Sequence, residues 1–180
     1  MADFDIFANQ LLEEAKRFLE RASESSDAIA ETANLHAALM LAFCALEAHV
    51  NSIGEELSIR TDLSAHDKGV LLERDVRLEE GEFKVQDALK MVRLEDRIEF
   101  LRTRFSTKPV DKSAVWWGQL ISAIRLRNEL THAKAVPSVT QSAVRNAIQA
   151  ILDALDALAK ALYGKRLPAA ELGLKSRMTF

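Results

Sequence analysis

The sequence predicts an all-α protein, a helical bundle of five to six helices around a four-helix core. Apolar residues recur at helical spacing through most of the 180-residue chain. Six Gly and three Pro are too few for a turn-rich β protein, and 48% hydrophobic with 28% charged residues excludes wholesale disorder. We expect a single domain over residues 1–164 and a basic, mobile tail over residues 165–180.

The N-terminal third predicts two long helices. An amphipathic helix is expected near residues 4–23, and the Ser-Glu-Ser-Ser-Asp segment at 23–27 ends it and offers N-caps. A second helix is expected over 28–57. Its middle, residues 37–46, is apolar on every side, which predicts a central helix covered by neighbours all round. This ten-residue run is too short to span a bilayer.

The middle of the chain is more varied. A short helix capped by Ser64 is expected over 64–75. Residues 76–85 are compatible with a loop, a short strand or a helix extension. A further helix is expected over 87–105, followed by a loop at 106–112 that contains Pro109.

Two helices are expected in the C-terminal part, over 113–135 and 138–163. Pro137 separates them, and Gly164 suits the position after the last helix. An apolar seam runs along the last helix and can pack inside the bundle or against a second copy, and core packing is the simpler interpretation. The seam consists of Ile148, Ile151, Leu155, Leu158 and Leu162.

Charge is distributed unevenly along the chain. Residues 1–60 carry a net −7, residues 61–100 carry −4 and residues 101–180 carry +8, within a total of −3. The basic part either offers a face to an anionic ligand such as RNA or attracts the acidic part within the fold. The N-terminus lacks the basic start and apolar stretch of a signal peptide, so a cytoplasmic location is expected.

Cysteine and histidine usage points away from metal chemistry. The single cysteine, Cys44, excludes an internal disulfide framework and a Cys-based zinc site, and it is expected to be an inert buried thiol. His36, His49 and His66 show no metal-ligand spacing. There is no Gly-rich phosphate loop either. We therefore expect no metal and no cofactor.

The helix expected over 113–135 changes character along one face. Its first turns present a core-facing apolar stripe about 100° wide, made of Trp117, Leu120, Ile121 and Ile124. The same face continues with polar residues: Arg127, Asn128, Thr131 and His132. Because burying these groups without partners is costly, they either form a satisfied polar network or border a cleft or subunit interface.

The polar residues on this face suit phosphodiester chemistry. Arginine offers a planar fork for phosphate, and histidine titrates near neutrality and can move protons. No carboxylate cluster accompanies them, so the reaction would be independent of metal. With a ribose substrate, the 2′-hydroxyl would be the natural nucleophile.

The segment Arg127-Asn128-Glu129-Leu130-Thr131-His132 resembles the R-x4-6-H motif of HEPN domains. HEPN domains are all-α, and their motif lies near the end of a late helix. They also carry an earlier helix with an acidic or polar residue facing the motif. The segment at 43–56 is similar to that helix, with Glu47, Asn51 and Glu55 sharing one face at spacing i, i+4 and i+8.

The resemblance implies a metal-independent ribonuclease, often a toxin of a toxin–antitoxin or defence system, that acts as a homodimer with a composite cleft. His132 would be the general base or acid, and Arg127 would bind the scissile phosphate. Asn128 would orient the phosphate or the imidazole, and Glu47 would orient Arg127 or the imidazole. Asn51, Thr131, Arg102 and Arg104 are candidate binding residues. RNA and an antitoxin are the implied partners.

Other interpretations stay open on the residues alone. Some HEPN domains have lost catalysis, so the alternative is a non-catalytic interaction or RNA-binding module with a buried polar network at the motif. The basic residues at 102, 104, 108 and 112 form either a solvated face or the wall of an RNA groove. Trp116 could stack on bases, whereas Trp117 lies on the core face. Residues 60–112 would be an insertion of unassigned role.

Overall fold

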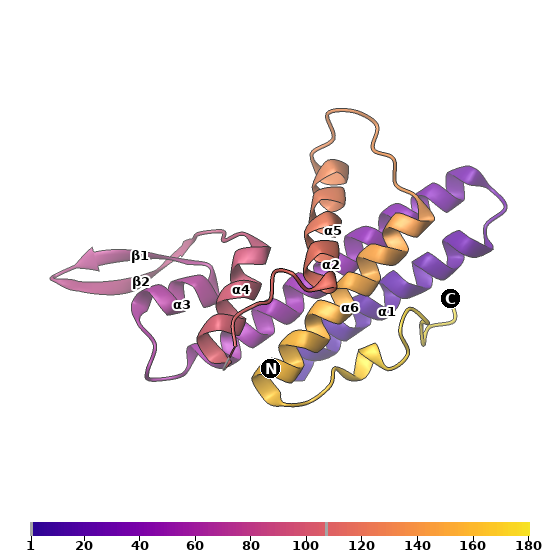
Figure 1. Ribbon diagram of the computed structural model, residues 1–180. Coiled ribbons are helices and arrows are strands. Elements are labelled where there is room, and N and C mark those ends of the chain that lie inside the picture. The colour runs from indigo at the N-terminus through magenta and orange to yellow at the C-terminus, as the bar shows by residue number, and fades with distance from the viewer. Residues whose placement is uncertain (1, 107) are drawn as a thin grey trace.

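The computed structural model describes residues 2–106 and 108–180, and within these residues it contains six α-helices (Figure 1). They are α1 (Ala2–Glu24), α2 (Ala28–Ser58), α3 (Ala65–Leu72), α4 (Leu94–Phe105), α5 (Val115–Thr131) and α6 (Gln141–Tyr163). Two strands, β1 (Arg74–Glu79) and β2 (Glu82–Leu89), and a short 3-10 helix, η1 (Pro168–Ala170), complete the elements. The predicted helical bundle is confirmed.

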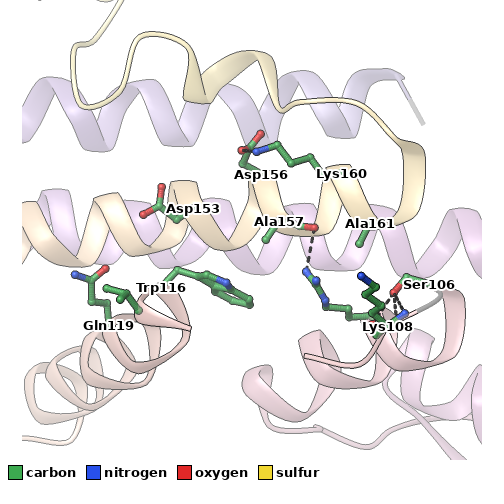
Figure 2. A pocket seen from close by; sticks show the side chains of 11 residues that line it. Ser106, Lys108, Trp116, Gln119, Asp153, Asp156, Ala157, Lys160 and Ala161 are labelled. Carbon is green, nitrogen blue, oxygen red and sulfur yellow. Dashed lines mark hydrogen bonds and ion pairs between the residues drawn. The ribbon is translucent and has the colours of Figure 1, made fainter. Parts of the chain in front are cut away.

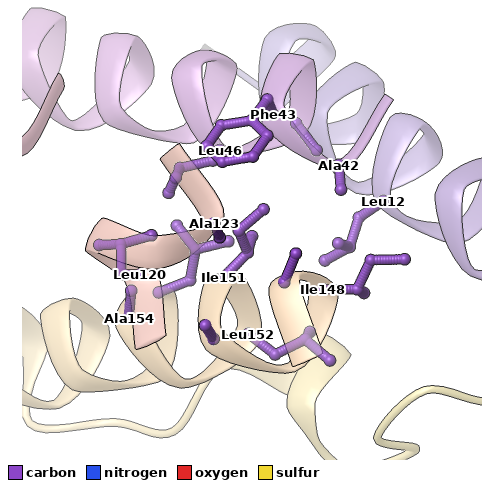
Figure 3. Close-up of a cluster of buried hydrophobic side chains, with 14 of the residues drawn as sticks. Leu12, Ala42, Phe43, Leu46, Leu120, Ala123, Ile148, Ile151, Leu152 and Ala154 are labelled. Atoms are coloured by element: carbon purple, nitrogen blue, oxygen red, sulfur yellow. The ribbon is translucent and has the colours of Figure 1, made fainter. Parts of the chain in front are cut away.

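Four helices meet in the main core. The long helices α1, α2 and α6 lie side by side, and α5 crosses α6 (Figure 1). Figure 3 shows Leu12 of α1, Phe43 of α2, Leu120 of α5 and Ile151 of α6 together, each at most 2% exposed. Burial of each such side chain contributes roughly 1.5–3 kcal/mol. The seam of α6 packs inside this core, with its first four residues buried.

Helix ends follow the capping residues. Asp27 caps α2 through its side chain, which accepts a hydrogen bond from the N–H of Ile29. Ser64 and Asp67 form a reciprocal capping box at the start of α3. Gly164 follows α6 with a φ of 66°, a left-handed conformation that glycine adopts without strain. The expected caps at 23–27, Ser64 and Gly164 are therefore present.

The centre of α2 is less enclosed than its composition predicts. α1 and α6 cover its apolar face, but Cys44 is exposed, so the expectation of a helix covered on all sides is wrong there. Alanine and cysteine are small, so they make a helix apolar in composition even where their side chains are exposed to solvent. Among the described helices, α2 alone is long and apolar enough to cross a bilayer, a property shared by buried core helices of bundles.

A β-hairpin replaces the start of the helix expected over 87–105. β1 and β2 pair antiparallel, with Leu78 opposite Phe83, and the connecting residues Glu80 and Gly81 both have positive φ. This two-residue turn matches the right-handed twist of the strands. α4 begins only at Leu94. In Figure 1 the hairpin projects from the end of the molecule where α3 and α4 pack.

Residues 165–180, expected to be a mobile tail, lie along α1. The Nε of Arg17 donates to the carbonyl of Phe180 at 2.7 Å, and the phenyl rings of Phe18 and Phe180 contact edge to face at 5.5 Å. The tail also covers Lys16, whose fully buried ammonium donates to the Ala169 carbonyl at 3.0 Å. Packing and hydrogen bonds therefore hold the tail against the bundle.

Candidate active site

The fold brings Glu47 of α2 and Arg127 of α5 together. The Nη1 of Arg127 lies 3.5 Å from the Oε1 of Glu47. The guanidinium also stacks over the Phe43 ring, with its central carbon 5.0 Å from the ring centroid, an arrangement that favours a cation. The two residues sit 80 positions apart in sequence, so their pairing depends on α5 packing against α2. A contact with Arg127 is one of the two roles that the resemblance implies for Glu47.

The ion pair borders a cleft of about 230 Å³ between α2, α4 and α5. Residues 91–93, which connect β2 to α4, line the cleft with Leu94 and Glu95 of α4, and Arg127 and Asn128 line it from α5. Asn51 and Glu73 also line the cleft. The last, polar turn of α5 therefore borders a cleft. The sequence pattern had left two options open, a satisfied polar network or a cleft or interface, and the structure shows a cleft.

A second arginine, Arg97 of α4, lines the same cleft and was not predicted. It is only 4% exposed. Its Nη1 donates to the Oδ1 of Asn51 at 2.7 Å and lies 3.0 Å from the Oε2 of Glu73, while its Nη2 donates to the Leu71 carbonyl at 3.0 Å. Burial lowers the pKa of Arg97, and the charges of Glu73 and Glu47 oppose that shift.

The sequence does contain a signal for Arg97. Leu94, Ile98 and Leu101 share one face of α4 at spacing i, i+4 and i+7, and Arg97 falls at i+3 on that same face. A charged residue inside an apolar stripe must have partners, because an unpaired buried charge is very costly. Its partners Glu73 and Leu71 come from the segment around the hairpin, which the helical pattern did not predict.

The two arginines differ in the donors that they have left. Arg97 is held on three sides by Asn51, Glu73 and a backbone carbonyl, so its role in the fold is structural. Arg127 has Glu47 as its ion-pair partner, and its side chain makes no hydrogen bond within the described residues, so its Nη groups keep free donors. Arg127 is therefore the arginine with donors available to an anionic ligand.

The end of α5 is solvent-exposed. The helix was expected to continue to residue 135, but it ends at Thr131. The N–H of His132 donates to the Asn128 carbonyl at 2.9 Å. The Thr131 hydroxyl bonds back to the Arg127 carbonyl at 3.0 Å. Asn128, Thr131 and His132 are all exposed. Within the described residues the imidazole of His132 makes no hydrogen bond or ion pair, and it does not line the cleft of its own chain.

The structure does not bring Arg102 and Arg104 to this cleft. Arg104 pairs with Asp62 at 3.6 Å and with Asp67 at 3.7 Å, near the start of α3. Arg102 points toward α6, where its Nη1 donates to the Ala157 carbonyl at 3.4 Å. Asn51, by contrast, does line the cleft, although its carbonyl oxygen already accepts from Arg97.

One prediction about a single side chain is wrong, and one buried histidine was not predicted. Cys44 is exposed, so the expected burial of its thiol is wrong, although local desolvation and the nearby Glu47 still raise its pKa and disfavour the thiolate. His49 is buried, with an Nε2 that has no partner in the described part of the chain, and burial lowers its pKa. Among the described residues, no group of three or more His, Cys, Asp or Glu could hold a metal ion.

Comparisons with known proteins add no relative. No protein-family model matches the chain. No curated protein and no solved structure matches it either.

Proposed function

We propose that this protein is a metal-independent endoribonuclease of the HEPN type, acting as a homodimer within a cytoplasmic toxin or defence module. The observation that carries the proposal is the ion pair of Arg127 with Glu47 at the edge of an open cleft. The Arg-x4-His segment supplies an imidazole one turn beyond that pair. An antitoxin partner would be the regulator of such a module.

The proposed reaction is an internal transfer within the RNA strand. His132, as general base, takes the proton of the 2′-hydroxyl while O2′ attacks the adjacent phosphorus. The bond from phosphorus to O5′ breaks, leaving a 2′,3′-cyclic phosphate, and O5′ takes a proton from solvent water to become the 5′-hydroxyl, while protonated His132 returns its proton to solvent. Arg127 holds the non-bridging oxygens and stabilises their growing negative charge. Asn128 and Glu47 keep the phosphate and Arg127 in position.

A second copy of the chain would complete the site. His132 is exposed at the end of α5 and does not line the cleft of its own chain, which suits a residue that acts across an interface. In the proposed dimer, the ends of two α5 helices meet, and each cleft faces the His132 of the partner copy. A twofold arrangement of this kind is the commonest among soluble oligomers.

The segment around residues 60–112 would have a role in this site. Glu73, residues 91–95 and Arg97 line the same cleft as Arg127. Met91 and Arg93 are exposed, so their side chains are available to a nucleotide that enters the cleft. The segment would therefore shape substrate access without supplying a proton-transfer group.

A non-catalytic interaction module remains the second candidate, and one observation favours it. Arg97, Asn51 and Glu73 form a satisfied buried network that fixes α4 against α2. His132 is exposed and lies outside this network. The His132→Ala variant should therefore be as stable as wild type whichever of the two functions is correct. Cleavage, not melting, therefore separates the two functions.

The test is an RNA cleavage assay in EDTA with wild type, His132→Ala, Arg127→Gln and a His66→Gln control. His66 is an exposed histidine that stacks on Phe83 of the hairpin, away from the cleft. We expect cleavage by wild type and His66→Gln, and a loss of at least about 100-fold in the other two. Absence of cleavage by a folded, dimeric wild type would contradict the proposal and favour the interaction module.

A further inference from the structure

A second and larger pocket, of about 700 Å³, lies between the end of α4, the start of α5 and the C-terminal half of α6. None of its lining residues lines the cleft at Arg127. Any ligand it holds would therefore be bound apart from the proposed cleavage site. We call it the α4–α6 pocket; its walls carry cations on one side and an aromatic ring with polar groups on the other (Figure 2).

The cationic wall consists of Arg102 and Lys108. Arg102 is half-buried and forms no ion pair within the described residues, although its charge helps to lower the pKa of Asp111. One of its Nη atoms donates to the Ala157 carbonyl at 3.4 Å, a long bond, and its buried Nε has no partner. Lys108 is exposed and its ammonium has no partner in the described part of the chain. Two neighbouring cations that form no ion pair favour an anionic ligand.

The start of α5 adds to the positive character of this wall. Its N-cap residue, Ala114, has no side chain that could satisfy the first N–H groups of the helix. Val115 and Trp116, which carry two of those groups, line the pocket. Helix N-termini attract phosphate through their N–H groups and dipole, and here that property coincides with Arg102 and Lys108.

An aromatic surface lies next to the cations. Trp116 is half-buried, and its ring packs edge to face on Trp117, with centroids 5.6 Å apart and planes at 89°. Because Trp117 is buried in the core, it holds Trp116 in place. Figure 2 shows the indole of Trp116 between Gln119 and Asp153 on one side and Lys108 on the other. A fixed indole beside cations can stack on a nucleobase.

The carboxylates of the pocket do not cancel this wall. Asp156 is already bound by Lys160 at 2.6 Å, by Arg166 at 3.6 Å and by the N–H of Leu167 at 3.0 Å. Asp153 accepts only from Gln149, at 2.9 Å. With Gln119, Asp153 is therefore a group that can accept a hydrogen bond from the amino group of a base.

We propose that the α4–α6 pocket binds a nucleoside 5′-phosphate, either as a free nucleotide or as one residue of an RNA strand. Arg102, Lys108 and the start of α5 hold the phosphate. Trp116 stacks on the base, and Asp153 with Gln119 faces its amino edge. Occupancy of this pocket requires no cleavage at the Arg127 cleft, so the proposal does not depend on the ribonuclease activity.

The experiment is a binding titration of the full chain at low salt. Calorimetry and tryptophan fluorescence are its two readouts. The probes are AMP, GMP, CMP and UMP, a 5′-phosphorylated RNA hexamer with 2′-O-methyl riboses, and inorganic phosphate. Wild type is compared with Arg102→Gln, Lys108→Gln and Trp116→Leu. Lys112→Gln is the matched control, because Lys112 lies in the same loop but pairs with Glu99 at 2.9 Å and does not line the pocket.

We expect Arg102→Gln and Lys108→Gln each to weaken nucleotide or hexamer binding by about tenfold, and Lys112→Gln to change it by less than about twofold. Trp116→Leu should remove the fluorescence change and weaken binding. Binding of mononucleotides identifies a free nucleotide as sufficient, and binding of the hexamer alone identifies an RNA strand. Lys108 is exposed, so its variant serves as the test if Arg102→Gln fails to fold.

Three results would overturn the proposal. The first is no binding of any nucleotide or of the hexamer. The second is inorganic phosphate binding as tightly as nucleotides, which would leave the aromatic wall without a role. The third is equal weakening by Lys108→Gln and Lys112→Gln, which would indicate a diffuse charge effect and not a pocket.

Discussion

At the scale of single residues, the cleft contains two arginines with different roles. Arg97 is buried and fully engaged, whereas Arg127 is held by one carboxylate and one aromatic ring and keeps donors in reserve. A buried, fully bonded arginine is typical of structural networks, and a partly open one is typical of anion binding. This difference makes Arg127, and not Arg97, the residue that the proposed chemistry needs.

The structural role of Arg97 gives a stability prediction. Arg97→Met should lower the free energy of unfolding by about 3 kcal/mol or more, because it leaves the carboxylate of Glu73 and the Leu71 carbonyl without their partner. Urea denaturation measures the change. Arg93→Gln is the control: Arg93 is 73% exposed in its ion pair with Glu95, and its loss should cost less than about 1 kcal/mol. Equal effects of the two variants would refute a structural network at Arg97.

His49 gives a prediction about pH. Burial lowers its pKa from the ordinary value of 6.5, opposed by the nearby charge of Asp5, so the unfolded chain takes up the proton more readily than the folded protein. The contribution of His49 is fully present above pH 6.5 and is lost as the pH falls below it. The free energy of unfolding should therefore fall between pH 7 and pH 5.

The His49→Gln variant isolates that contribution. Its free energy of unfolding should fall less steeply over the same pH range than that of wild type, by up to about 1.4 kcal/mol per pH unit. Denaturation curves at several pH values provide the measurement. His66→Gln, at an exposed histidine, should keep the wild-type slope. Parallel slopes for wild type and His49→Gln would show that His49 is not the responsible group.

Sequence reasoning identified one side of the cleft and missed the other. Arg127, Asn128 and Glu47 were predicted because each interrupts or shares a readable helical face. Arg97 also interrupts a helical face, but its partner Glu73 lies beside a hairpin, and for residues 76–85 the sequence left a loop, a short strand and a helix extension open. The burial of individual side chains such as Cys44 was not predictable, because composition alone does not say which side of a helix its neighbours cover.

At the scale of elements, the hairpin shows where local pattern misleads. Leu89, Met91 and Val92 fit a helical spacing with Leu94, yet Leu89 and Met91 are exposed and α4 begins only at Leu94. The alternation of Val76 with Leu78 and of Phe83 with Val85, on either side of a Glu-Gly turn, is the strand signal. The long helices were predicted within a few residues because their apolar stripes extend over many turns.

Two helix glycines should respond in opposite ways to alanine. A Cβ at Gly54 of α2 would lie 2.5 Å from the Leu71 carbonyl oxygen, whereas a Cβ at Gly118 of α5 would meet nothing within 4 Å. Gly54→Ala should therefore lower the free energy of unfolding by about 1–3 kcal/mol, because the new methyl group pushes α3 away from α2. Gly118→Ala should raise the free energy of unfolding by about 0.5–1 kcal/mol, because alanine has a better helix propensity than glycine.

Thermal and urea unfolding of the two glycine variants measure this difference. The variants change the same residue type to the same side chain inside helices, so each controls for the other. A stable Gly54→Ala protein would mean that α2 and α3 do not pack as closely as the structure has them. A destabilised Gly118→Ala protein would indicate that the open face of α5 is covered in solution.

At the scale of the whole molecule, the C-terminal segment packs against the first helix. The segment at 165–180 covers Lys16 and packs Phe180 on Phe18, so the acidic first helix and the basic end of the chain lie together. The uneven charge of the sequence is thus partly an internal match. Arg102 and Lys108, which form no ion pair within the described residues, both line the α4–α6 pocket.

Removing residues 165–180 should therefore destabilise the protein. We expect the melting temperature to fall by at least about 4 °C, because the tail buries part of α1 and α6 and supplies the Ala169 carbonyl to Lys16. Lys175→Gln, at an exposed lysine of the tail, is the control and should melt like wild type. An unchanged melting temperature after truncation would mean that the tail does not rest on α1 in solution.

The measurement that tests the proposed function most directly compares two oligonucleotides of one sequence, one with ribose and one with 2′-O-methyl ribose throughout. Each is incubated in EDTA with wild type and with His132→Ala, and the fragment ends are identified. The account predicts that wild type alone cuts the ribose strand, that the products end in 2′,3′-cyclic phosphate, and that the 2′-O-methyl strand stays intact. Cleavage of both strands, of neither strand, or equal cleavage by His132→Ala would contradict it.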